Sequence, residues 1–153
     1  METVAIKSLQ TGHVGLNVTD LSRSLPFYLR VFGLEVQAEG KEEGRRWAFL
    51  GREGQLVLTL WQQSCTAYST TSAGLHHLSF QVESIDDVKA AEHLLRDLSA
   101  EFAYDGVVPH SEGASSGGIF FTDPDGIRLE IYAATGADTE PAPNGAAPTC
   151  GFF

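Results

Sequence analysis

Positive charge, cysteine and long apolar runs are all scarce in this sequence. Its 153 residues include 10 lysines and arginines against 20 aspartates and glutamates, which gives a formal net charge of −10. Such a surface repels phosphate backbones and anionic lipids, so we expect neither nucleic acid nor a membrane as a partner. No apolar run is long enough to cross a bilayer, and the N-terminus lacks a secretory pattern, so we expect a cytoplasmic protein.

Only two cysteines are present, Cys65 and Cys150, and they lie far apart in the sequence. They fit no metal-binding or redox spacing. Because disulfides are rare in the cytosol, we expect free thiols, and neither cysteine is assigned a role.

The sequence does contain an internal repeat. The stretches 12–18 and 74–82 both carry apolar residues at alternate positions, as in a strand with one buried face, and both carry a histidine, His13 or His77. The two histidines are 77 − 13 = 64 residues apart. The expected helix starts after each strand, Asp20 and Ser84, are also 84 − 20 = 64 residues apart.

Each histidine strand is followed by a helical pattern and then by three strand-like runs. We therefore predict an α+β fold with two tandem βαβββ modules, at about 12–62 and 74–133, within one domain, 1–133. An edge strand through Val4 and Ile6 is also expected. The predicted later strands are 34–38, 46–50 and 55–62 in the first module and 103–108, 116–122 and 127–133 in the second.

The segment 134–153 is rich in alanine, proline, glycine and threonine. Such a composition buries too little apolar surface to offset the entropy of ordering, so we expect a flexible tail. The terminal Cys150-Gly-Phe-Phe stretch is unusual for such a segment.

Three residues at repeat-related strand positions are candidate metal ligands: His13, His77 and Glu130. A carboxylate on a buried strand is costly unless it is paired or bound to metal. Two neutral imidazoles and one carboxylate suit a divalent ion and leave coordination positions open. Each residue taken alone is more typical of a structural role, and it is their joint placement that indicates a metal site.

On these residues the chain resembles the vicinal oxygen chelate superfamily, over residues 13–133. That superfamily includes glyoxalase I, extradiol dioxygenases, methylmalonyl-CoA epimerase and the fosfomycin and bleomycin resistance proteins. The resemblance is carried by the runs HVGLNVTDLSRSLPFY from His13, FGLEV, HLSFQV from His77 and FTDPDGIRLE ending at Glu130. It implies paired βαβββ modules that form a curved mixed sheet around a metal cleft. His13, His77 and Glu130 take its ligand positions, whereas strand phase excludes His76.

Two positions depart from relatives within that superfamily. Glyoxalase I usually supplies a further ligand and base from the last strand of the first module, where this chain has Thr59. A neutral hydroxyl is a poor ligand and a poor base, which lowers the expectation of glyoxalase or epimerase chemistry. Extradiol dioxygenases need an acid–base histidine in the loop before the last strands, and His110 lies in that region. They often carry a tyrosine ten residues before the carboxylate ligand, and this chain has Phe120 at that position.

The resemblance thus predicts a metal-dependent dioxygenase acting on a catechol-like or vicinal-diol substrate, with His110 as the catalytic residue. A glyoxalase I-like lyase or isomerase is the first alternative, and a non-catalytic antibiotic-binding protein is the second. Fe(II) is the expected metal, with Mn, Ni, Co and Zn as alternatives, and a homodimer is the expected assembly. The candidate substrate-pocket residues are Thr59, Trp61, Tyr132 and Phe120, for which core packing is the alternative role.

Overall fold

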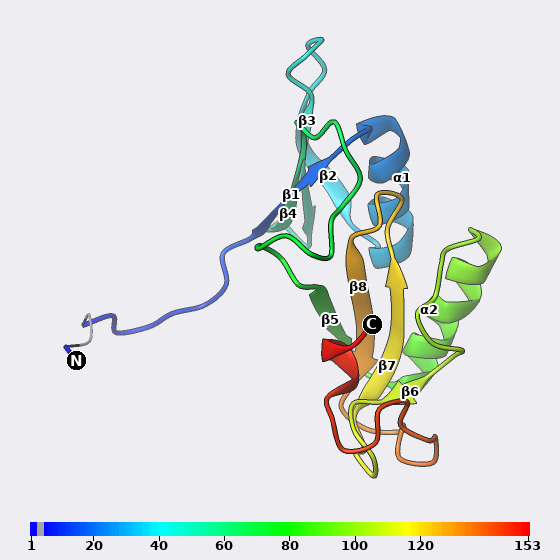
Figure 1. The fold of residues 1–153 in the computed structure, drawn as a ribbon. Helices are drawn as coiled ribbons and strands as arrows, with labels where there is room; N and C mark the ends of the chain where they lie inside the picture. Colours follow the sequence, from blue (N-terminus) through cyan, green and yellow to red (C-terminus); the bar gives the residue numbers. More distant parts are fainter. Residues whose placement is uncertain (3–4) are drawn as a thin grey trace. The chain divides into compact units, whose positions relative to one another are not determined.

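The computed structural model describes residues 1–2 and 5–153 (Figure 1). The chain forms two compact units, Met1–Cys65 and Thr66–Phe153, and each unit contains one of the predicted modules. Of the expected edge strand, Val4 lies outside the described residues and Ile6 is in no strand. In the described part of the chain, no helix has the length and apolar character needed to span a membrane.

In its described residues, the first unit contains one helix and one mixed sheet of four strands. The strand order is β1-β4-β3-β2, with β1 parallel to β4 and the other pairs antiparallel. This arrangement confirms the predicted βαβββ module. The elements are β1 (Val14–Val18), α1 (Leu21–Phe32), β2 (Glu35–Gly40), β3 (Trp47–Arg52) and β4 (Gln55–Gln62).

Local chemistry fixes both ends of α1. The Asp20 side chain accepts a hydrogen bond from the Ser22 backbone N–H at 2.9 Å, which satisfies a donor that the helix leaves unpaired. Gly33 ends the helix with φ 61°, a conformation that costs glycine least. Leu21 and Tyr28 are almost fully buried, as are the sheet residues Leu16, Leu50, Leu58 and Leu60.

The second unit repeats this topology. Its strand order is β5-β8-β7-β6, again with the first pair parallel and the others antiparallel. In register, Gly15 faces Thr59 in unit 1 and Ser79 faces Glu130 in unit 2, which confirms the repeat. The elements are β5 (Leu78–Val82), α2 (Ile85–Asp97), β6 (Val108–Pro109), β7 (Gly117–Thr122), β8 (Arg128–Ala133) and the 3₁₀ turn η1 (Thr149–Gly151).

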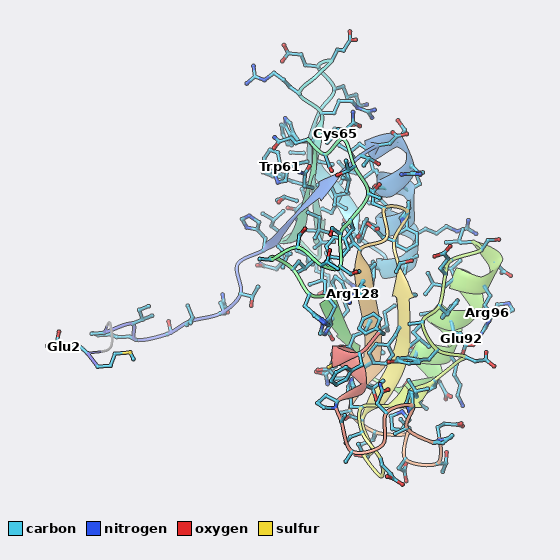
Figure 2. All side chains as sticks on the ribbon, viewed as in Figure 1. Glu2, Trp61, Cys65, Glu92, Arg96 and Arg128 are labelled. Carbon is cyan, nitrogen blue, oxygen red and sulfur yellow. The ribbon has the colours of Figure 1, made fainter. Side chains whose placement is uncertain are left out.

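Two predicted strands in unit 2 are too long. The strand predicted at 74–82 begins only at Leu78, so His77 lies in the chain that leads into β5. The strand predicted at 103–108 is reduced to β6, with an isolated bridge at Phe102. Arg96 of α2 bonds to Asp105 at 3.1 Å and to its helix neighbour Glu92 (Figure 2), and its guanidinium lies over the Phe102 ring. These contacts tie side chains of 102–105 to α2, while the backbone meets β7 at the Phe102–Phe121 bridge and through the Ala103 N–H, which donates to Phe120 O at 2.9 Å.

The segment 134–153, for which we expected flexibility, follows a defined path along unit 2. The Ala137 backbone N–H donates to Ser115 O at 2.9 Å, and the Thr149 backbone N–H donates to His110 O at 2.7 Å. Ala137 and Thr149 are fully buried. Backbone hydrogen bonds to loops of the unit therefore supply the anchoring that composition alone did not predict.

The turn between β7 and β8 is held by one buried carboxylate. Asp123 Oδ1 accepts from the backbone N–H groups of Asp125 at 2.8 Å and Ile127 at 2.9 Å. Hydrogen bonds to a buried charged acceptor are among the stronger ones, so Asp123→Ala should lower the free energy of unfolding by about 2–4 kcal/mol. Urea denaturation measures this loss. The exposed Asp138 is the control, and equal stabilities of the D123A and D138A proteins would contradict the assignment.

Candidate metal centre

Glu130 is a carboxylate in the middle of β8 and is only 3% exposed. Its Oε1 lies 3.3 Å from His77 Nε2, and its Oε2 lies 2.9 Å from His110 Nε2. Among the residues that the structure describes, no lysine or arginine forms an ion pair with it. A buried carboxylate is costly without compensation, and within the described residues its ion-pair contacts are with these two imidazoles.

His77 reaches Glu130 through the pairing of β5 with β8. It directly precedes β5, where Ser79 is the register partner of Glu130. Burial lowers the pKa of His77, and the nearby Glu130 carboxylate opposes this only in part. Burial thus favours the neutral ring, which is the form that binds a metal.

His76 is the neighbour that the sequence argument excluded on strand phase. Neither His76 nor His77 lies in a strand, so strand phase does not decide between them. His76 is exposed and its Nδ1 lies 2.8 Å from His77 Nδ1, whereas His77 is the histidine beside Glu130. Of the two histidines, His77 is therefore the one that the structure places beside Glu130.

His110 directly follows β6 and lies on the other side of Glu130. Its Nδ1 is 2.8 Å from Ser116 Oγ, so both ring nitrogens have partners. The ring packs edge-on against Tyr132, with centroids 5.0 Å apart, and against Phe120 at 6.2 Å. Phe120 is fully buried and is the cross-strand partner of Glu130, so both pocket candidates of unit 2 lie beside the centre.

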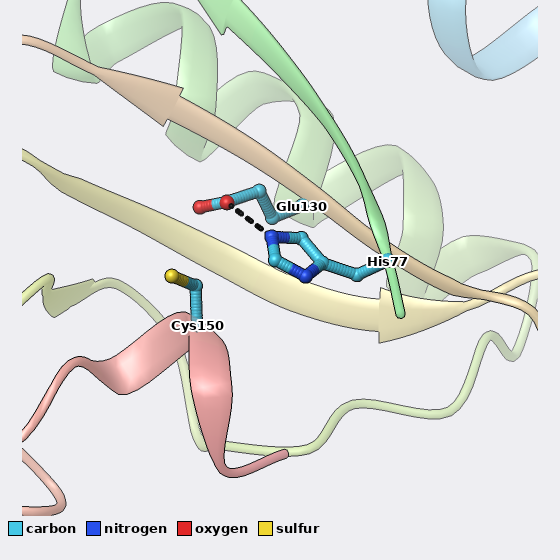
Figure 3. A group of neighbouring side chains, drawn as sticks. All are labelled: His77, Glu130 and Cys150. Atoms are coloured by element: carbon cyan, nitrogen blue, oxygen red, sulfur yellow. Dashed lines mark ion pairs between the residues drawn. The ribbon is translucent and has the colours of Figure 1, made fainter. Parts of the chain in front are cut away.

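Cys150 joins this group, and sequence reasoning did not predict it. One donor atom each from His77, Glu130 and Cys150 lie within 4.8 Å of one another, and Figure 3 shows the three neighbouring side chains, with Cys150 supplied by η1. Burial, and then the Glu130 carboxylate, raise the pKa of this thiol. The only signal in the sequence was the unusual Cys150-Gly-Phe-Phe end, because cysteine spacing cannot reveal a chain that folds back.

The donors gathered here fit a divalent transition metal. Imidazole nitrogen, carboxylate oxygen and thiolate sulfur are all ligands of such ions. In the part of the chain that the structure describes, the buried carboxylate has no ion pair with a lysine or arginine, and a divalent metal would neutralise its charge.

The corresponding positions of unit 1 have a different character. Thr59, the repeat counterpart of Glu130, is 1% exposed, and its Oγ1 accepts a hydrogen bond from Trp61 Nε1 at 2.9 Å. Its hydroxyl is therefore already engaged. His13 directly precedes β1, as His77 precedes β5, and is exposed within unit 1. The structure describes His13 in that unit alone, so its role in the centre is argued from the repeat.

Aromatic side chains gather on the same sheet. Trp47, Phe49 and Trp61 form a cluster with ring centroids 4.9–6.2 Å apart. A pocket of about 410 Å³ lies beside Trp47 and Trp61, and most of its remaining lining comes from Gly40 at the end of β2 and from the loop that follows it. This volume is in the range of small-molecule sites.

Comparison with known proteins gives consistent matches. Residues 10–131 match the family model described as the Glyoxalase/Bleomycin resistance protein/Dioxygenase superfamily. The chain is 31% identical over 128 residues to the uncharacterized protein YaeR of Escherichia coli, covering 80% of this chain and 95% of that protein. It is 29% identical over 128 residues to catechol-2,3-dioxygenase of Bacillus subtilis, covering 80% of this chain but only 40% of that protein.

Solved structures share the fold. The glyoxylase/bleomycin resistance protein/dioxygenase domain from Frankia sp. superposes with a TM-score of 0.68 and 28% identity, covering 83% of this chain and 93% of that domain. The fosfomycin resistance protein FosX from Listeria monocytogenes, solved with Mn(II) and sulfate, superposes with a TM-score of 0.61. The sequence identity between FosX and this chain is 20%, and the superposition covers 88% of this chain and 98% of FosX. At that identity the likeness shows the fold alone.

Proposed function

The chain belongs to the Glyoxalase/Bleomycin resistance protein/Dioxygenase superfamily, and from that premise we propose that it is a metal-dependent enzyme with dioxygenase-type chemistry. The proposed substrate is a small catechol-like molecule or vicinal diol. The observation that carries the proposal is the buried Glu130 carboxylate, whose two oxygens lie 3.3 Å from His77 Nε2 and 2.9 Å from His110 Nε2.

In this proposal His77, Glu130 and His13 hold a divalent metal, with Fe(II) as the expected ion and Mn, Ni, Co and Zn as alternatives. His13 enters as the repeat counterpart of His77, either from the same chain or from a second copy in a homodimer. A redox-active ion in a two-histidine, one-carboxylate site supplies binding of vicinal oxygens and activation of O₂. The chain's own contribution is a buried carboxylate of fixed orientation and an imidazole kept neutral.

His110 is proposed as the acid–base residue. Its Nε2–H donates to the Glu130 carboxylate in the structure, so the ring would act first as the acid, giving this proton to a substrate oxygen, and the deprotonated Nε2 would then take up a proton from a later substrate group. In the neutral ring Nδ1 accepts from the Ser116 hydroxyl, which keeps the ring in place. Tyr132 and Phe120 flank this ring, and the half-buried Tyr132 would offer an apolar surface to a planar substrate, whereas the fully buried Phe120 would support the His110 ring from within the unit. Trp61 and Thr59 are further pocket candidates.

The lyase alternative lacks a base at the position of Thr59, since the hydroxyl there is neutral and already accepts from Trp61. This observation favours oxygen chemistry over proton transfer of the glyoxalase I kind. The antibiotic-binding alternative does not explain a buried carboxylate between two histidines, because drug binding needs no metal ligands.

Anaerobic reconstitution tests the proposal. Protein loaded with Fe(II) and then given O₂ and a panel of catechols should consume oxygen and form a yellow ring-opened product, with turnover that metal-free protein lacks. Absence of oxygen uptake across the panel would contradict it. Isomerisation of a methylglyoxal–glutathione hemithioacetal by the Ni(II) or Zn(II) protein would instead establish the lyase alternative.

A further inference from the structure

The C-terminal segment places a third type of donor at the centre. It is anchored at Thr149, a fully buried residue whose hydroxyl donates to Pro109 O at 2.6 Å and whose backbone N–H donates to His110 O at 2.7 Å. The Tyr104 hydroxyl donates to Thr149 O at 3.2 Å. The next residue is Cys150, within the turn η1, so its position is set by contacts on its own neighbour.

The last residues of the chain strengthen this placement. The Phe153 ring lies 5.6 Å from the His77 ring and 4.9 Å from the Phe120 ring, edge-on in both cases. Arg128 Nη1 donates to Phe153 O at 2.8 Å. Segment 149–153 is therefore fastened on both sides of Cys150, and its aromatic end covers the ring of a proposed metal ligand.

We infer that Cys150 is a further ligand of the metal proposed for this centre, delivered by segment 149–153, which acts as a strap across the site. The inference rests on the proposed metal site. Binding would break the S–H bond, release the proton to solvent and form a metal–sulfur bond. The three donor atoms are within 4.8 Å of one another, whereas ligands of one tetrahedral ion lie about 3.5 Å apart, so small side-chain movements suffice.

A thiolate ligand would have two consequences. It favours softer ions such as zinc, iron and cobalt over magnesium, calcium or manganese, which narrows the range of metals. It also couples metal binding to the ordering of segment 149–153. The metal–sulfur bond would fasten this segment at Cys150, in addition to the contacts of Thr149 and Phe153.

Cobalt(II) substitution tests the inference, with Cys150→Ser as the variant and Cys65→Ser, at an exposed cysteine of unit 1, as the matched control. Wild type and C65S should show sulfur-to-cobalt charge-transfer absorption in the near ultraviolet. C150S should still bind cobalt, without that absorption and at least about tenfold more weakly. Hydrogen exchange in segment 149–153 should slow on cobalt addition in wild type and C65S but not in C150S.

The outcomes distinguish the role of Cys150 from the existence of the metal site. Cobalt bound with the same spectrum and affinity in wild type and C150S would overturn the role of Cys150 and leave the metal site intact. Failure of wild type to bind cobalt would overturn the metal site itself and the strap with it.

Discussion

Glu130→Gln protein is expected to lose metal affinity by more than about 100-fold while keeping its fold. Glutamine has nearly the same size, but its neutral amide cannot supply the negative charge that a divalent ion requires. The metal-free variant should be at least as stable as wild type. Glu130 is only 3% exposed, and the substitution removes its buried negative charge. Metal affinity by calorimetry and thermal unfolding of the metal-free proteins measure the two effects separately.

Glu101→Gln is the matched control, since Glu101 is an exposed glutamate of the same unit. The E101Q protein should bind metal as wild type does. Wild-type affinity in E130Q would show that this carboxylate is not a ligand. A large loss of stability in metal-free E130Q would show instead that its bonds to His77 and His110 are chiefly structural.

The second large effect is expected at His110. With turnover established for the Fe(II) protein, His110→Gln should lower kcat by about 10²–10⁴-fold, the usual contribution of a general acid–base residue. Metal content should stay close to wild type, because the glutamine amide can still donate a hydrogen bond toward Glu130. Steady-state oxygen uptake and metal analysis of the same preparation check both statements.

His93→Gln is the control for this change, because His93 is exposed on α2 and its only described ion-pair partner is Asp97 at 3.9 Å. The H93Q protein should keep the kcat and the metal content of wild type. Loss of metal from H110Q would make His110 a ligand or a positioning residue for Glu130. An unchanged kcat would remove it from the mechanism.

Much of the fold follows from local signals in the sequence. Asp20 precedes α1 as predicted, because helix capping depends on a few neighbouring atoms. The equivalence of Thr59 and Glu130 also follows, since a repeat fixes register once its two copies are aligned. The same alignment selected His77 and Glu130, which the structure brings within 3.3 Å of each other.

Features that depend on distant contacts were not predictable in this way. The strand expected at 103–108 is reduced to β6, and the pairing of the preceding stretch with β7 is limited to the Phe102–Phe121 bridge and neighbouring hydrogen bonds. The path of 134–153 depends on single hydrogen bonds such as Thr149 to His110, which leave no periodic pattern. Cys150 was missed for the same reason, because only the folded chain brings it beside Glu130.

The central claim is that His77 and Glu130, with His13, form a divalent metal site. X-ray absorption spectroscopy of wild type and His13→Ala protein, both loaded with Fe(II) without oxygen, tests it most directly. The account predicts one metal per chain with two imidazole ligands in wild type and one in H13A. Binding without imidazole ligands, or the same imidazole count in both proteins, would contradict it.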